Sequence, residues 1–318
     1  MRYLLTVCML MCLFLIALPS ISALKGSWLL DLVVNFQLTY ALLTFFLLIV
    51  TFWLVRSLFL ISFCLYVVFT IVNFASLLPA VPNLTGHSVS DDVYVFQGNL
   101  SYYNADMDAL YDFLDKKNAD IYILFEVNDT QREAFGKLAN GRPNLGYAQI
   151  EGLPAGMGII SKYPIVKRHI HQFEGKSAVI IELELLIDHQ LVRFYALHPP
   201  SPRTKESWQT RNQLLAELKN LVKHHPQQIT WITGDINTSP WSYYFPRFDF
   251  LTPCIEQVGY YTSWPHSKAV AWLANVVRIA IDHCFMSEHM TILEFKTVTI
   301  PNSDHLGLEY RFILNQSR

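Results

Sequence analysis

Residues 229–237 read Ile-Thr-Trp-Ile-Thr-Gly-Asp-Ile-Asn, an apolar run that ends in a glycine and two polar side chains. The run begins with β-branched and aromatic residues, a composition that favours a β-strand. Asp235 and Asn237 follow it, where a strand end would fix their side chains rigidly at the rim of a cleft. On its own the motif could equally be a turn, so its meaning depends on the runs around it.

Further polar groups take the same kind of position, beside apolar runs of strand length. These groups are Asn99, Glu126, His198, Asp282, Asp304 and His305. The strand-like runs lie at residues 92–96, 121–125, 158–161, 178–186, 191–197, 229–233, 281–286, 292–300 and 306–313, and helical spacing recurs at 107–114, 133–138 and 204–224. A long β-rich middle with helices at intervals favours an α/β layered fold over a simple doubly wound sheet.

The set and order of these groups resemble the endonuclease/exonuclease/phosphatase superfamily, which includes pancreatic deoxyribonuclease, neutral sphingomyelinases and inositol polyphosphate phosphatases. The resemblance covers residues 93–314, and Gly-Met-Gly-Ile-Ile-Ser-Lys-Tyr-Pro at 156–164 is similar to the central strand and turn of that family. It implies an α/β four-layer sandwich of two packed mixed β-sheets flanked by helices. It also implies a hydrolase that needs one divalent ion, Mg²⁺ with Mn²⁺ as a substitute.

The resemblance also implies which side chains hold the metal. Glu126 corresponds to the main metal carboxylate, Asn99 to a polar group beside it, and Asp304 to a second acidic group near the metal. Oxygen ligands suit Mg²⁺, which keeps several waters, so one or two carboxylates suffice.

The remaining groups are expected to act on the substrate and on water. By the resemblance, His305 acts on the attacking water while Asp282 holds its imidazole in the productive tautomer. Asp235 positions or deprotonates that water, and Asn237 and His198 hydrogen-bond the phosphoryl oxygens. Each residue alone would more often be an ion pair, a cap or a core histidine, whereas the full set in family order favours a hydrolase site.

The first part of the chain is different in composition. Residues 1–82 hold only four charged side chains and contain uncharged stretches at 3–24, 32–55 and 57–81, each long enough to cross a bilayer as a helix. The remaining 236 residues carry a net charge of −4. We therefore expect three transmembrane helices in residues 1–82, a linker at 83–92 and a catalytic domain at 93–318, which excludes a wholly cytosolic protein, a disordered chain and a disulfide scaffold.

Charge placement predicts the orientation. Arg2 and Arg56 mark one end of the helices, and Lys25 with Asp31 the other, so the positive-inside rule puts the domain on the extracytoplasmic side of the cell membrane. A first helix cleaved as a signal, after the small residues at 20–23, would leave this topology unchanged. Asn35 and Gln37 are expected at the interface or against a neighbouring helix.

Two cysteines of the domain, Cys254 and Cys284, could pair in an oxidising compartment if their Cα atoms lie close enough.

Several features favour a lipid-linked phosphate as substrate. The domain follows a membrane helix closely, and its net negative charge disfavours polyanionic DNA. The apolar residues 269–281 could insert between lipid headgroups or pack in the core. A three-helix anchor with such a domain also resembles bacterial membrane proteins associated with teicoplanin resistance, and Thr-Ser-Trp-Pro at 262–265 matches a segment of that branch; Trp264 could line the pocket or lie in the core.

The sequence thus predicts a membrane-tethered, Mg²⁺-dependent phosphatase or pyrophosphatase that acts on a lipid by metal-assisted attack of water. An extracytoplasmic nuclease or sphingomyelinase-like phosphodiesterase is the alternative, and it would need a basic groove that Arg203, Lys205 and Arg211 supply only weakly. A non-catalytic binding module is disfavoured, because a site without function has no need to retain buried charges.

Overall fold

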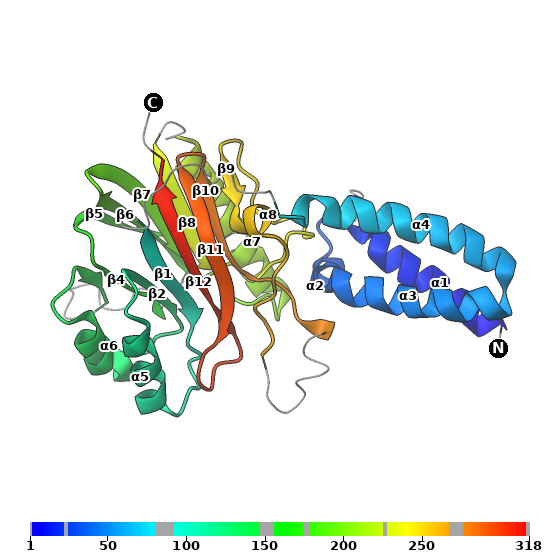
Figure 1. The fold of residues 1–318 in the computed structure, drawn as a ribbon, viewed down its shortest axis with the longest axis horizontal. Helices are drawn as coiled ribbons and strands as arrows, with labels where there is room; N and C mark the ends of the chain where they lie inside the picture. Colours follow the sequence, from blue (N-terminus) through cyan, green and yellow to red (C-terminus); the bar gives the residue numbers. More distant parts are fainter. Residues whose placement is uncertain are drawn as a thin grey trace.

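The computed structural model describes residues 2–21, 25–79, 92–146, 156–173, 178–224, 228–266 and 276–315. A β-rich domain forms one end of the molecule, and a bundle of long helices extends from it (Figure 1). The predicted linker at 83–92 lies almost wholly outside the described residues.

The domain contains two six-stranded sheets. The first has the order β11 (Met290–Thr299), β12 (Leu306–Leu314), β1 (Val93–Asn99), β2 (Ile121–Phe125), β4 (Gly158–Ser161) and β3 (Asn144–Leu145). The second has the order β5 (Ile165–Gln172), β6 (Val179–Ile187), β7 (Gln190–Leu197), β8 (Ile229–Asp235), β10 (Asp282–Ser287) and β9 (Leu251–Pro253). Each sheet is mixed, because β1 pairs with β2 and β7 pairs with β8 in parallel among otherwise antiparallel neighbours.

The two sheets pack face to face because their strands alternate. Val93 and Val95 of β1 point inward, where they meet the second sheet's Ile181 and Trp231 in one buried cluster. On the outer face of the first sheet, apolar residues such as Phe96 pack under α5 (Met107–Lys117) and α6 (Arg132–Ala139). The outer face of the second sheet packs against α7 (Lys205–Lys223). The helix–sheet–sheet–helix order confirms the predicted four-layer sandwich.

The helix predicted at 204–224 is confirmed in α7. The Thr204 side chain accepts a hydrogen bond from the Ser207 amide and so caps the first turn. Trp208, Leu214 and Leu218 recur at helical spacing and are buried on the side that faces the sheet.

Sequence patterning did not identify β5, β3, β9 or the short helix α8 (Cys254–Val258). Strand β5 reads Ile-Val-Lys-Arg-His-Ile-His-Gln and lies at the edge of its sheet, paired only with β6. Charged residues at an edge strand oppose pairing with other chains, and they also hide the apolar alternation on which strand prediction depends.

Three N-terminal helices are long and apolar enough to cross a membrane: Arg2–Ser20, Trp28–Leu54 and Arg56–Leu77. They comprise α1 (Arg2–Ala17), η1 (Leu18–Ser20), α2 (Trp28–Val33), η3 (Val34–Phe36), α3 (Gln37–Leu54), α4 (Arg56–Phe74) and η4 (Ala75–Leu77). The second helix begins before the predicted residue 32, because Ser27 caps it through the Leu30 amide. Large apolar side chains such as Phe46 and Trp53 are exposed on this bundle, as expected of a surface that meets lipid.

Polar residues of the anchor find partners inside the bundle and on the domain. The Gln37 amide donates to the Leu15 carbonyl at 3.0 Å, which confirms the expected contact with a neighbouring helix. Asp31 forms a buried ion pair with Arg211 of α7, with 2.5 Å between carboxylate and guanidinium. Trp241 donates through Nε1 to the Asn73 carbonyl at 2.9 Å. The N-terminal helical bundle is therefore docked on the domain by specific contacts as well as by the chain connection.

Candidate active site

The predicted polar groups meet at one edge of the sandwich. Parallel strands β1 and β2 end at Asn99 and Phe125, and parallel β7 and β8 end at Leu197 and Asp235. The antiparallel register of β8 and β10 sets Asp235 directly opposite Asp282. Strand ends from both sheets thus bring distant parts of the sequence to one place.

Asn99 connects two carboxylates in this cluster. Its amide donates to Glu126 Oε1 at 3.0 Å and to Asp235 Oδ2 at 3.1 Å. The other Glu126 oxygen accepts from the Tyr102 backbone amide at 2.9 Å. Glu126 has a φ of 57°, a left-handed conformation that costs free energy in a residue other than glycine. The surrounding hydrogen bonds hold this conformation, which turns the carboxylate toward the cleft.

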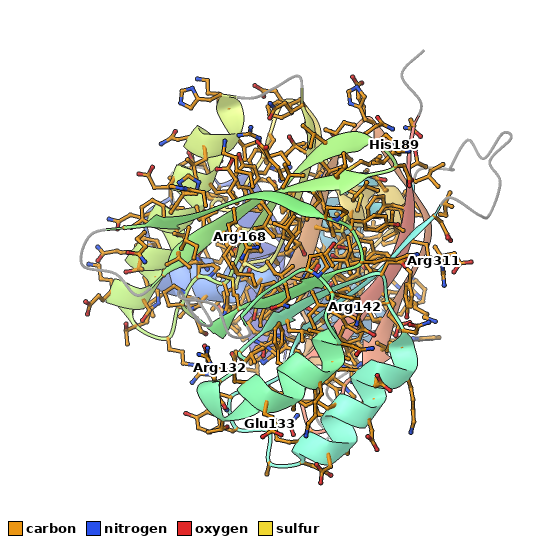
Figure 2. The ribbon with its side chains drawn as sticks, turned by 90° about the vertical axis from the view of Figure 1, so that its left-hand side faces the viewer. Arg132, Glu133, Arg142, Arg168, His189 and Arg311 are labelled. Carbon is orange, nitrogen blue, oxygen red and sulfur yellow. A yellow bond between two sulfur atoms is a disulfide. The ribbon has the colours of Figure 1, made fainter. Side chains whose placement is uncertain are left out.

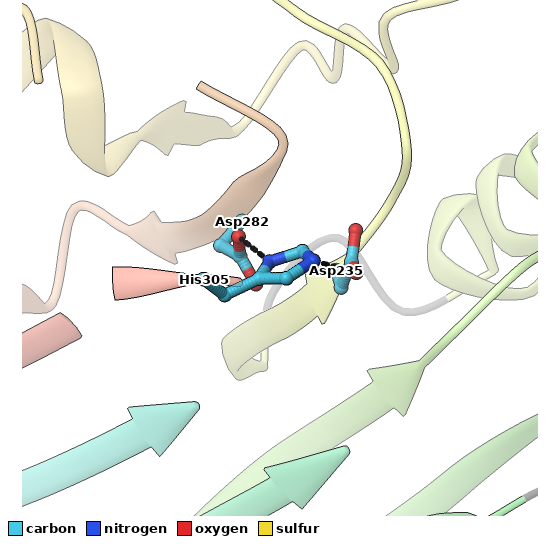
Figure 3. Close-up of side chains that lie close together, drawn as sticks. All are labelled: Asp235, Asp282 and His305. Atoms are coloured by element: carbon cyan, nitrogen blue, oxygen red, sulfur yellow. Dashed lines mark hydrogen bonds and ion pairs between the residues drawn. The ribbon is translucent and has the colours of Figure 1, made fainter. Parts of the chain in front are cut away.

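His305 lies between two aspartates (Figure 3). Its Nδ1 is 2.9 Å from Asp282 Oδ2, a hydrogen bond, whereas its Nε2 is 3.7 Å from Asp235 Oδ2. The Ser263 hydroxyl accepts from the Asp282 amide at 3.2 Å, and the Ser303 hydroxyl accepts from the His305 amide at 3.0 Å. The histidine and its carboxylate partner are therefore each fixed through the backbone.

Burial and mutual charge set the protonation of this cluster. Burial and, second, the nearby Asp282 carboxylate raise the pKa of Asp235 to about 8. Burial opposes protonation of His305, but Asp282 and Asp235 outweigh it and raise the pKa of the imidazole to about 10. Burial lowers the pKa of His198, which favours a neutral imidazole. Such perturbed groups in a cleft are typical of catalytic sites.

The remaining predicted residues line the same cleft. His198 Nε2 is 3.8 Å from Glu126 Oε1 and 3.6 Å from Asp235 Oδ2, distances too long for hydrogen bonds. The Asn237 side chain donates to the Pro199 carbonyl at 3.1 Å. Asp304 is exposed, and its carboxylate accepts from Trp264 Nε1 at 3.1 Å.

These side chains surround a pocket of about 660 Å³, within the size range of small-molecule sites. The predicted site residues on its wall are Glu126, His198, Asp235, Asn237, Asp304 and His305. Asn99 and Asp282 are buried behind them. Trp264 lines the pocket, which resolves the two alternatives for this residue. Residues 269–275 of the apolar stretch at 269–281 lie outside the described residues, whereas Ile279 and Ile281 line the pocket.

The donor set fits a hard divalent cation. Asp235, Asp282 and His305 each offer a ligand atom, and these atoms lie within 4.8 Å of one another. The Asp282 Oδ1 atom is buried and has no hydrogen-bond partner among the described residues. Glu126 adds a further carboxylate at hydrogen-bond distance from Asn99. Clustered carboxylate oxygens are ligands that Mg²⁺ prefers, whereas Asn99 directs its amide nitrogen at the carboxylates and its oxygen accepts from the Ser101 amide.

Two polar residues next to the predicted site have structural roles instead. Gln97 reaches across to the second sheet and donates to the His283 carbonyl at 3.3 Å. The His283 ring is fully buried, with Nε2 3.0 Å from the Ala280 carbonyl.

The pocket also includes residues that the sequence analysis missed, among them Tyr102, Leu32 and Phe36. Leu32 and Phe36 belong to the second apolar helix, where no sequence pattern separates a pocket residue from any other apolar residue.

Comparison with known proteins agrees with this architecture. Residues 93–305 match the model of the endonuclease/exonuclease/phosphatase family. The crystal structure of humanized D. rerio TDP2 is similar, with a TM-score of 0.59 and 15% identity over 70% of this chain and 99% of that one. A family protein from Bacteroides thetaiotaomicron gives a TM-score of 0.53 at 14% identity, over 70% of this chain and 98% of that one. The human Nocturnin catalytic domain with bound sulfate gives 0.51 at 17% identity, over 72% and 97%. No curated protein sequence matches the chain.

Proposed function

Since the chain belongs to the endonuclease/exonuclease/phosphatase family, we propose that it hydrolyses lipid-linked phosphate esters or anhydrides at a membrane surface. The family consists of metal-dependent phosphohydrolases, so the chain is a hydrolytic enzyme of this class. The lipid substrate is supported by one observation above all: the catalytic pocket opens beside the anchor, and residues of the second apolar helix form part of its wall. A phosphate carried by a membrane lipid would therefore lie close to the reacting groups.

In the proposed reaction, His305 and Asp235 act on the attacking water. His305 Nε2 and Asp235 Oδ2 are 3.7 Å apart, too far for a direct hydrogen bond and close enough to share one water molecule. Asp282 fixes the ring through Nδ1 at 2.9 Å and thereby keeps Nε2 directed at that water. In its ionised form, whose share increases as the pH rises toward the pKa of about 8, Asp235 would accept the proton of the water as the new phosphorus–oxygen bond forms.

His198 and Asn237, which line the same pocket, would bind the phosphoryl oxygens. A neutral His198 can donate one hydrogen bond, and Asn237 can donate through its amide. Donors already in place stabilise the negative charge that builds up on the phosphoryl group. Glu126 and Asp304, with Asn99 beside Glu126, would hold the divalent ion, expected to be Mg²⁺ with Mn²⁺ as a substitute, and this ion would supply Lewis acidity to the phosphate when bound.

We propose further that the domain lies outside the cytoplasm, in a multi-pass protein of the cell membrane. The chain start and the turn between α3 and α4, which carry Arg2 and Arg56, lie at the end of the bundle away from the domain (Figure 1), as the positive-inside rule requires for this orientation. Cys254 and Cys284 form a disulfide, with 5.3 Å between their Cα atoms, which suits an oxidising compartment.

The domain face opposite the anchor carries charged side chains, including Arg132, Glu133 and Arg168 (Figure 2). A charged face suits contact with water, so this arrangement is consistent with a domain that meets the membrane only at its anchor end.

The nuclease alternative is weaker than the lipid hydrolase. It requires cations that can contact a nucleic-acid backbone, but Arg211 is fully buried in its ion pair with Asp31. Arg203 is one of the three cations considered for such a groove, and it lines the pocket, whereas Lys205 and Arg211 do not.

The substrate class can be tested with the purified full chain in detergent, with Mg²⁺ or with chelator. Plasmid DNA, sphingomyelin and undecaprenyl pyrophosphate are supplied in parallel, and His305→Ala and Glu126→Ala serve as controls. Metal-dependent release of inorganic phosphate from the isoprenoid alone supports the proposal. Nicking of the plasmid at a comparable rate would favour the nuclease. Equal behaviour of wild type and both variants on every substrate would favour a non-catalytic module.

A further inference from the structure

One wall of the catalytic pocket comes from the membrane anchor. Glu126, Asp235 and His305 of the domain line the pocket together with Leu32 and Phe36 of the second apolar helix. The side chains of Leu32 and Phe36 are both half-buried. Apolar residues of the domain, Ile279 and Ile281, line the same pocket. One pocket therefore holds both the polar groups of the candidate active site and apolar side chains, which a purely ionic substrate would not require.

Hydrogen bonds fix this anchor segment against the catalytic turn, the residues 235–239 at the end of β8 that include Asp235 and Asn237. The Asn35 side chain accepts from the Ser239 backbone amide at 3.0 Å and donates to the Asp31 carbonyl at 2.7 Å. Trp28 Nε1 donates to the carbonyl of Pro202, another residue of the pocket wall, at 2.9 Å. Contacts on both sides hold the Leu32 and Phe36 wall in place relative to the catalytic groups.

The same wall continues directly into the membrane-crossing part of the anchor. Phe36 ends η3, and the next residue begins α3, which runs through the apolar bundle. Thr39, in the first turn of α3, donates to the Val276 carbonyl at 2.7 Å and ties the helix to the segment before Ile279. A hydrocarbon chain could pass from the bilayer along this helix into the pocket without crossing water, which avoids the cost of exposing apolar surface.

We propose that Leu32 and Phe36 form a binding site for the hydrocarbon chain of the substrate, next to the phosphate. This inference rests on the proposed function and narrows the substrate to phosphates or pyrophosphates with a long alkyl or isoprenyl chain. The anchor then determines specificity, because chain length decides how much apolar surface a substrate buries against it.

The test compares two substrates that share a headgroup and differ in chain length: dimethylallyl pyrophosphate, which is water-soluble, and a long-chain polyprenyl pyrophosphate. The full chain is assayed in mixed micelles as wild type, Phe36→Ala and Leu32→Ala. Phe46→Ala provides a matched control, since Phe46 belongs to the same helix and is 62% exposed outside the pocket.

We expect Phe36→Ala to lower kcat/KM for the long chain by about tenfold to a hundredfold, mainly through KM, and to leave the short substrate within about twofold of wild type. Leu32→Ala should act in the same direction, and Phe46→Ala should change neither value. Equal losses on both substrates would overturn the inference, because they would indicate a structural defect. Unchanged long-chain kinetics in both variants would also overturn it.

A binding measurement separates this inference from the proposed function. A long-chain alkyl phosphate with a photoreactive group at mid-chain is cross-linked to the full chain and mapped by mass spectrometry. Cross-links to residues 28–36 support the chain site if an excess of a non-photoreactive long-chain phosphate prevents them. This result would support the chain site even if the wild type releases no phosphate from any lipid, in which case the proposed function fails. Label confined to the lipid-facing sides of α1 and α4 would overturn the chain site.

Discussion

The buried ion pair between Asp31 and Arg211 offers a sharp test of how the anchor is joined to the domain. The Arg211 side chain is fully buried and that of Asp31 is 5% exposed, with 2.5 Å between the charged groups. Asp31 also accepts from Trp208 Nε1 at 2.9 Å. Asp31→Asn keeps the shape and part of the hydrogen bonding, but it leaves the Arg211 charge without its counterion.

Breaking a buried pair in this way costs about 3–5 kcal/mol. We take about 3 kcal/mol for Asp31→Asn, because the amide oxygen still accepts a hydrogen bond. In a domain of this size each kcal/mol lowers Tm by about 2–4 °C, so we expect a decrease of about 6–12 °C. Replacing both partners, as Asp31→Leu with Arg211→Leu, removes the unpaired charge and should restore most of the lost stability.

The assay is thermal unfolding of the full chain in detergent, followed by tryptophan fluorescence. Lys219→Ala, an exposed change on the same helix α7, is the control and should leave Tm unchanged. A decrease below about 2 °C for Asp31→Asn would refute the reasoning. The single variants Asp31→Leu and Arg211→Leu are measured beside the double variant. If the double variant loses as much stability as the two single variants together, the reasoning is also wrong, because the two partners would then act independently.

Three further predictions follow from other parts of the molecule. Burial lowers the pKa of His283 to about 4, compared with about 6.5 in the unfolded chain. Between these two pH values the unfolded state binds more protons than the folded state, so the free energy of unfolding falls by about 3 kcal/mol as the pH decreases from about 6.5 to about 4. In urea titrations at several pH values, His283→Gln should remove this part of the pH dependence. Replacing Cys254 and Cys284 by alanine opens a loop of 30 residues and should cost about 3–4 kcal/mol in the same titrations; a loss below about 1 kcal/mol would contradict the disulfide. Chelation should abolish phosphate release, and added Mg²⁺ should restore it in wild type but not in Glu126→Ala; full activity in chelator would exclude a metal role.

Much of the fold could be predicted because its signals are local. The apolar run at 229–233 ends where Asp235 begins the catalytic turn, and Thr204 caps the helix that follows β7. Strand ends carry the candidate site, so a short apolar run followed by a polar group marked Glu126 and Asp235 as candidates. Their convergence in space was expected only from the family resemblance, because pairing of distant strands leaves no local trace.

Other features could not be predicted, for identifiable physical reasons. The edge strand β5 has few apolar residues because its outer side meets water. Docking of the anchor depends on the ion pair between Asp31 and Arg211, which lie 180 positions apart in the sequence. From the sequence alone, a single charged residue near a membrane helix is interpreted as evidence on the orientation of that helix. Leu32 and Phe36 are ordinary apolar residues in sequence, and only the position of the catalytic turn beside them makes them part of the pocket.

The central claim is that one metal-dependent centre, built from strand ends of both sheets, hydrolyses a phosphate presented at the membrane. Release of inorganic phosphate from a long-chain polyprenyl pyrophosphate in proteoliposomes tests it most directly, with wild type and His305→Gln reconstituted at equal density. We expect Mg²⁺-dependent turnover by the wild type, at a rate that falls at least about a hundredfold in His305→Gln. Equal phosphate release by the two proteins, or none by wild type with Mg²⁺ or Mn²⁺ supplied, would contradict it.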